Sequence, residues 1–165
     1  MQIPTPLSIL SGHILFTLKT IAMNTQKFLV SGIIGGIVAF FSGFLIYGLL
    51  LMDFFTKNAG TATGTMKAQA DFVWWALVAG SICQGLLMSY IFNKWANIHS
   101  LGAGATAGAV ISFFVTAGFD LTMFATSNLS TLTGSCVDII AGTVMGAIVG
   151  GAVGMANGMG SKKTV

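Results

Sequence analysis

The sequence predicts an all-α fold: a bundle of four transmembrane helices with an interfacial helix ahead of it. Hydrophobic residues make up 55% of the 165 residues and charged residues only 7%, whereas soluble domains carry about 25% charged residues. Four apolar segments follow one another, each about as long as the roughly 20 helical residues that cross a hydrocarbon core about 30 Å thick. Such segments form helices because lipid offers no partner to a free backbone group.

The elements follow in order along the chain. Residues 1–22 carry an apolar run too short to cross a bilayer, without the basic start of a secretory signal. We expect an interfacial helix there or, because Met23 is a second plausible start, an upstream extension. The remainder predicts one membrane domain over residues 23–160 and a tail over 161–165. The predicted spans cover residues 28–52, 72–93, 101–125 and 134–156.

The lysines predict the orientation of the bundle. With an even number of spans, both ends of the chain lie on one side of the membrane. That side collects five of the seven lysines, namely Lys19, Lys27, Lys94, Lys162 and Lys163. The positive-inside rule places this side, with both termini, in the cytoplasm. All four acids fall in the opposite half, at Asp53, Asp71, Asp120 and Asp138, and Asp71 is the expected N-cap of the second span.

Small residues recur at a spacing of four in three spans, which places them on one face of each helix and lets backbones approach closely. The glycines of these rows predicted to pack are Gly35, Gly43, Gly104, Gly108, Gly142, Gly146, Gly150 and Gly154. An offset of 73 residues superposes the row of the first span on that of the third. Two related hairpins, produced by an internal duplication, are therefore a hypothesis.

Two acids are the candidate ion or proton site. Asp120 lies inside the third span, where an ionisable residue is a functional hypothesis by default; the structural alternative is an acid that reaches the interface or bonds to Ser and Thr neighbours. Asp138 has the third position of a capping box that begins at Ser135. The short connection between the last two spans predicts an antiparallel hairpin with both acids at similar depth. Carboxyl groups within side-chain reach would share a proton or hold a cation.

Other features point to structure rather than chemistry. Gln84, in the middle of the second span, predicts a hydrogen bond to another helix, and Cys83 and Cys136 are expected to be buried small apolar residues. His99 is expected to be an ordinary loop residue. No enzyme motif, metal-ligand set or cofactor motif is present. The scattered lysines argue against nucleic acid as a partner.

Three stretches carry a resemblance to a known family. Residues 43–55 (GFLIYGLLLMDFF), the pair Trp74-Trp75 and residues 137–148 (VDIIAGTVMGAI) resemble a family of small bacterial four-helix membrane proteins of unknown function. The resemblance covers residue 28 to about residue 154. It implies a bacterial cytoplasmic membrane, and it supplies no substrate and no catalytic residues.

These observations leave two functions open. The first is a non-enzymatic protein of the lipid bilayer that packs through its small-residue faces, as a homo-oligomer or as an accessory subunit of a larger membrane complex. The alternative is a small transporter or channel for protons or cations that uses Asp120 and Asp138.

Overall fold

The computed structural model describes residues 24–65 and 67–159, and all its named elements are helices. The predicted interfacial helix over residues 1–22 and the tail over 161–165 lie outside the described residues. In chain order the elements are α2 (Thr25–Gly43), the π-helix η1 (Phe44–Leu50), α3 (Met52–Lys57), the short 3₁₀-helix η2 (Gln69–Asp71), α4 (Trp74–Ile91), the π-helix η3 (Phe92–Ala96), α5 (Leu101–Thr126) and α6 (Leu132–Gly158).

Four helices are long and apolar enough to cross a membrane: Thr25–Leu50, Trp74–Ala96, Leu101–Thr126 and Leu132–Gly158. The prediction of an all-α bundle with four spans is therefore confirmed. The second span does not begin as predicted, because Asp71 belongs to η2 and the N-cap position of α4 is Val73, which makes no side-chain capping bond. The chain is a multi-pass membrane protein by the length and composition of these helices.

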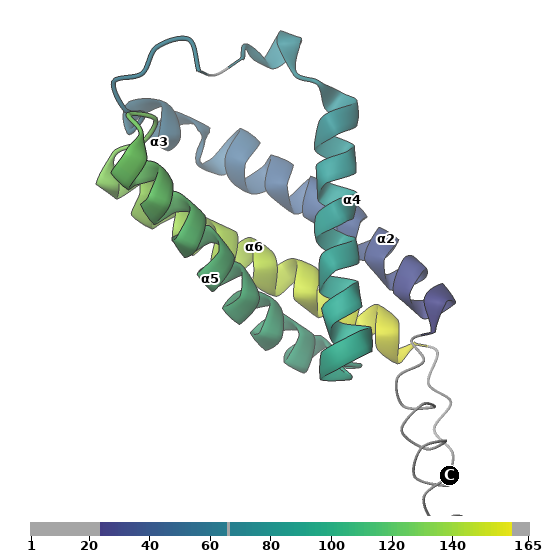
Figure 1. Ribbon diagram of the computed structural model, residues 1–165. Coiled ribbons are helices and arrows are strands. Elements are labelled where there is room, and N and C mark those ends of the chain that lie inside the picture. Colours follow the sequence, from purple (N-terminus) through teal and green to yellow (C-terminus); the bar gives the residue numbers. More distant parts are fainter. Residues whose placement is uncertain (1–23, 66, 160–165) are drawn as a thin grey trace, which may run out of the picture.

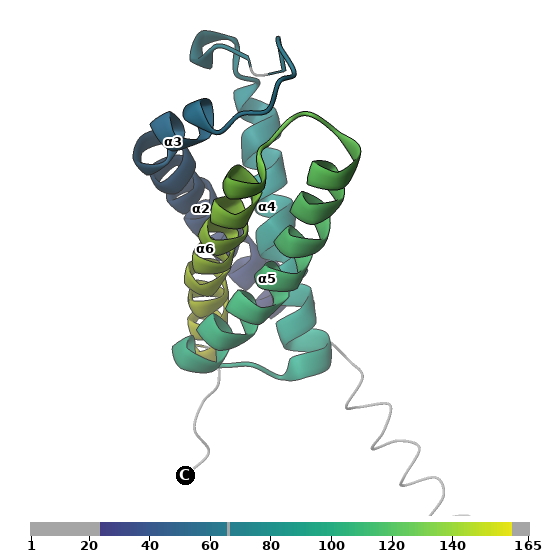
Figure 2. The ribbon, with the colours of Figure 1, turned by 90° about the vertical axis from the view of Figure 1, so that its left-hand side faces the viewer.

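The four helices are arranged around α6. Helices α5 and α6 form an antiparallel hairpin, α2 lies along the other flank of α6, and α4 crosses α2 obliquely (Figures 1 and 2). Helix α2 begins and α6 ends at the same end of the bundle (Figure 1), here called the termini side. The opposite end, here called the loop side, holds α3, the start of α4 and the turn between α5 and α6.

Glycines join α5 and α6 along their whole length. A Cβ atom built on Gly104 or Gly108 would collide with the backbone of Gly150 or Gly146, and one built on Gly158 would collide with the carbonyl group of His99. The small residues therefore act at this interface by letting the two backbones touch. This face of α6 is occupied within the chain itself.

The contact between α2 and α4 is different because the helices cross, with contacts from Phe28 to Gly36 of α2 and from Ile82 to Ser89 of α4. Gly35 and Gly36 of α2 lie against Gly85 and Ile82 of α4, while Gly80 has no atom within 4 Å of its Cβ position. The two helix pairs thus pack in different ways, at a single crossing in one and along a full seam in the other. The hypothesis of two related hairpins gains no support from this packing.

A buried polar network joins α2, α4 and α6 on the termini side. The Ser31 and Ser89 hydroxyl groups lie 2.7 Å apart, and the Asn93 amide donates to Asn157 Oδ1 at 3.0 Å. Ser31, Ser89 and Asn157 are each at most 1% exposed. Gln84, which was predicted to join helices in this way, makes no hydrogen bond to any described residue. The interhelical hydrogen bonds of α4 are therefore made by Ser89, whose bonded neighbour Asn93 lies just beyond α4 in η3.

Candidate functional site

A phenol and a carboxyl group meet near the loop side of the bundle. The Tyr47 hydroxyl donates to Asp138 Oδ1 at 2.7 Å, joining η1 to α6. The predicted capping box is wrong: Thr131 is the N-cap of α6, and its side chain accepts from the Gly134 amide. Asp138 therefore lies about 9 Å along the helix from Leu132, at 1.5 Å per residue. Its carboxyl group is free to face η1 instead of capping the helix.

The π-helix η1 sets the position of Tyr47. The Leu51 amide donates to the Ile46 carbonyl, an i to i+5 bond of 2.8 Å that defines the wider turn. Just before it, the Ser42 hydroxyl donates to the Val38 carbonyl at 2.7 Å, a back-bond that often bends helices. π-helical turns are rare and are frequent at functional sites. Tyr47 lies in the middle of this segment.

Asp120 is the buried member of the cluster. It lies in α5, its side chain is 8% exposed, and its Oδ2 atom is buried without a hydrogen-bond partner among the described residues. The Asp120 carboxyl group lies close enough to that of Asp138 for the two to interact electrostatically. The structure thus brings the two sequence-predicted acids together.

The hairpin geometry explains why these acids meet. Asp120 lies six residues before the end of α5 at Thr126, and Asp138 lies six residues after the start of α6 at Leu132. Two carboxylates in contact repel each other, and neither has a hydrogen to donate. Their contact is therefore stabilised when one of them carries a proton or when a cation lies between them.

No family model, curated protein or solved structure matches this chain. The resemblance to a bacterial four-helix family therefore stays a prediction, and the candidate site is defined by its own geometry.

Phe55 of α3 and residues 58–62, here called the lid, pack on Tyr47 and on the turn between α5 and α6. The Phe55 ring of α3 stacks on the Tyr47 ring with centroids 5.8 Å apart. Beyond α3, the chain pairs with the turn between α5 and α6: the Gly60 amide donates to the Leu129 carbonyl at 3.1 Å, and the Ala62 amide donates to the Asn128 carbonyl at 3.0 Å. These bonds hold residues 58–62 against the hairpin that carries both acids.

Tyr47 is the member of the site that the sequence prediction missed. It ends the row of small residues in the first span, and the offset of 73 that defines the hypothesis of duplication places it opposite Asp120. A polar residue at the end of a row of small residues is a weak indication of a functional site, and the sequence contains it at Tyr47. The other two acids, Asp53 and Asp71, are exposed on the loop side and do not belong to the cluster.

Other candidate features lie elsewhere. Cys83 and Cys136 are both exposed, so the prediction that they are buried is wrong. His99 contacts Asn97 Oδ1 through Nε2 at 2.8 Å, in the connection before α5 on the termini side. Within residues 24–65 and 67–159, no three His, Cys, Asp or Glu side chains form a metal site.

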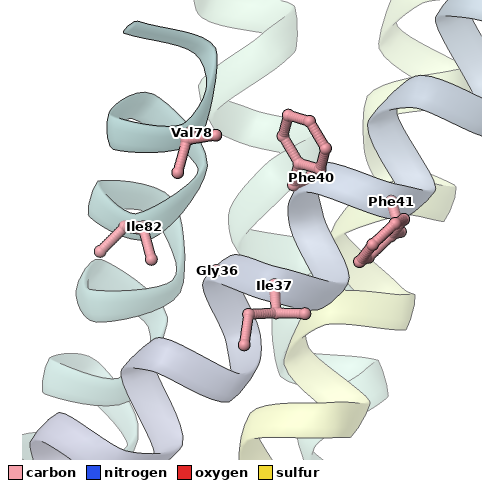
Figure 3. Close-up of a pocket in the computed structure, with 6 residues that line it drawn as sticks. All are labelled: Gly36, Ile37, Phe40, Phe41, Val78 and Ile82. Atoms are coloured by element: carbon pink, nitrogen blue, oxygen red, sulfur yellow. The ribbon is translucent and has the colours of Figure 1, made fainter. Parts of the chain in front are cut away.

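A cavity of about 100 Å³ lies between α2 and α4 (Figure 3). Its wall is apolar and comes from both helices, at Gly36, Ile37, Phe40, Phe41, Val78 and Ile82. With no polar group in its lining, this cavity offers nothing to a proton or a cation. The carboxyl pair is therefore the candidate site.

Proposed function

We propose that this chain is a small transporter whose cargo, a proton or a cation, binds at the cluster of Tyr47, Asp120 and Asp138. The observation that carries the proposal is the Asp120 carboxyl group, buried with an unpartnered oxygen atom beside a second acid. An intramembrane acid is costly to bury and is retained in membrane proteins chiefly for function.

A proton fits this cluster better than a metal cation. Calcium and magnesium sites in proteins are built from several oxygen ligands, and within the described residues no three His, Cys, Asp or Glu side chains are placed to hold a metal ion. The Tyr47 hydroxyl already donates its hydrogen to Asp138. A proton needs only two facing oxygen atoms, and the adjacent carboxyl groups of Asp120 and Asp138 supply them.

The packing beyond the cluster favours a transporter over an open channel. A core of Ala39, Met88, Phe92, Val149 and Val153, each at most 2% exposed, fills the bundle on the way to the termini side. Access from the loop side is shorter, because Asp120 and Asp138 each lie six residues from the loop-side end of their helix, where the lid of Phe55 and residues 58–62 packs. We infer that the cargo enters from the loop side and that passage to the other side requires the helices to move.

Flux measured in liposomes tests the proposal. The full-length protein is reconstituted with a pH-sensitive dye inside, and a pH or cation gradient is applied. Asp120→Asn removes the ionisable group at nearly constant volume, and we expect at least a tenfold loss of flux. Asp53→Asn is the matched control, because Asp53 is exposed in α3 on the same side. Its flux should equal that of the native protein.

The outcomes separate the two cargoes. Flux driven by a pH gradient in the absence of sodium, potassium and calcium assigns a proton. Flux that needs one of these cations assigns that cation. Flux that Asp120→Asn leaves unaltered removes the carboxyl pair from any transport role and overturns the proposal.

Assembly as a homo-oligomer or accessory subunit is the second candidate function. The glycine row of α6 does not favour it, since α5 already covers that row. The loop-side half of α4 does favour it, because every residue from Val73 to Gly80 is exposed. A helix face without a partner inside the chain is available to a partner outside it.

A further inference from the structure

The loop-side half of α4 holds no buried residue. The helix packs on α2 from Ile82 to Ser89, and before Ile82 it meets α2 only across the apolar cavity that Val78 lines. Trp75 is 76% exposed. Between Trp74 and Ile91 the sequence carries no charged residue, so a second helix can approach this half without electrostatic repulsion.

Gln84 is the feature of this helix that lipid cannot satisfy. It lies next to the midpoint of the span Trp74–Ala96. Its side chain is half-buried and makes no hydrogen bond to any described residue. The transfer of an amide from water to hydrocarbon is strongly unfavourable in free energy when the amide makes no hydrogen bond there. Hydrocarbon tails have neither donors nor acceptors, so the partner must be another protein group.

Gly80 lies one helical turn before Gln84 on the same face. A Cβ atom at Gly80 would have nothing within 4 Å, in contrast to the colliding positions at Gly85 and Gly108. This glycine is thus small without serving any contact inside the chain. A small residue one turn from a polar one is the pattern by which membrane helices approach closely and then form a hydrogen bond.

We propose that a second copy of this chain docks on α4 through Gly80 and Gln84. Two copies in one membrane have the same topology, so a twofold axis along the membrane normal places Gln84 opposite Gln84 at the same depth. An amide carries both a donor and an acceptor, and the pair satisfies itself. The inference rests on the second candidate function, assembly, and names its partner and its surface.

Cross-linking and mass measurements test this surface on the full-length protein. Cys83 is exposed beside Gln84, so in a Cys136→Ser background mild oxidation in native membranes should link two copies through Cys83. In parallel, sedimentation in mild detergent should give a dimer. Gln84→Leu should weaken that dimer about tenfold, within the range measured for interhelical hydrogen bonds in membranes. Gln84→Asn keeps the amide and is the matched control.

The possible results test separately whether the chain dimerises and whether the dimer forms through Gly80 and Gln84 of α4. A cross-linked dimer that Gln84→Leu weakens and Gln84→Asn preserves supports the proposal. A protein that is monomeric at every concentration, with no Cys83 cross-link in membranes, overturns both assembly and this surface. A dimer that Gln84→Leu leaves intact and Cys83 does not link overturns the surface alone. A Cys83 link to a chain of different mass overturns the second copy as the occupant.

Discussion

Gly108→Ala tests the seam between α5 and α6 with a single methyl group. A Cβ atom on Gly108 would lie 2.8 Å from the Cα atom of Gly150, and it would collide with the carbonyl oxygen of Gly146. Carbon atoms in contact normally lie about 3.5 to 4.0 Å apart, so the two helices would have to separate by about 1 Å at this level. Both obstacles are backbone atoms, which no rotamer change can remove.

The expected cost follows from overpacking. Extra methyl groups in a packed core destabilise by about 1 to 3 kcal/mol. For a chain of this length, 1 kcal/mol changes the midpoint of unfolding by about 2 to 4 °C. We therefore expect Gly108→Ala to unfold about 2 to 12 °C below its control in a thermal assay that follows the fraction of monodisperse protein in lipid discs.

Gly118→Ala is that control. It lies in the same helix, and its Cβ position has nothing within 4 Å, so it shares the change in helix propensity without the collision. The difference between the two variants isolates the contact with α6. If Gly108→Ala unfolds at or above the temperature of Gly118→Ala, the backbones of α5 and α6 do not touch at Gly108, and the expected destabilisation is refuted.

Two further substitutions examine the polar contacts at the two ends of the bundle. Ser89→Ala removes a fully buried hydroxyl that bonds to Ser31 and to the Phe28 carbonyl, and thermal unfolding should report a loss of about 1 to 2 kcal/mol; an unchanged midpoint would contradict this network. Thr131→Val removes the cap of α6 and the bond to the Asn58 carbonyl at 3.0 Å, so hydrogen exchange at the Gly60 and Ala62 amides should accelerate. Exchange as slow as in the native protein would show that the lid does not depend on Thr131.

The spans could be predicted from the sequence because bilayer thickness determines their length. Each predicted span overlaps its observed helix and differs by a few residues at the ends, as for 134–156 against Leu132–Gly158. The meeting of Asp120 and Asp138 could be predicted for a related reason. A short turn between two antiparallel helices brings residues at equal distances from the turn to one depth, whatever the rest of the bundle does.

The predictions that proved wrong depend on contacts between segments that lie far apart in the sequence. The start of α6 depends on Thr131, which bonds to the Asn58 carbonyl across the loop side, and no local pattern contains that partner. The interhelical hydrogen bond predicted for Gln84 is made by Ser89 instead. Spacing along a helix does not say which face meets a neighbouring helix. At the crossing, Gly85 turns toward α2, and the side of α4 that holds Ser89 turns with it.

Both π-helices hold a polar side chain that bonds to α6. In η1, Tyr47 donates to Asp138, and in η3, Asn93 donates to Asn157. Helical spacing alone places Tyr47 on the correct face, because Gly35 and Gly43 of the same row lie against Val153 and Met145 of α6. The sequence pattern shows this face but not its partner, since Asp138 lies 91 residues further along the chain. The π-helices coincide with the two contacts, one at the carboxyl pair and one at the network of the termini side.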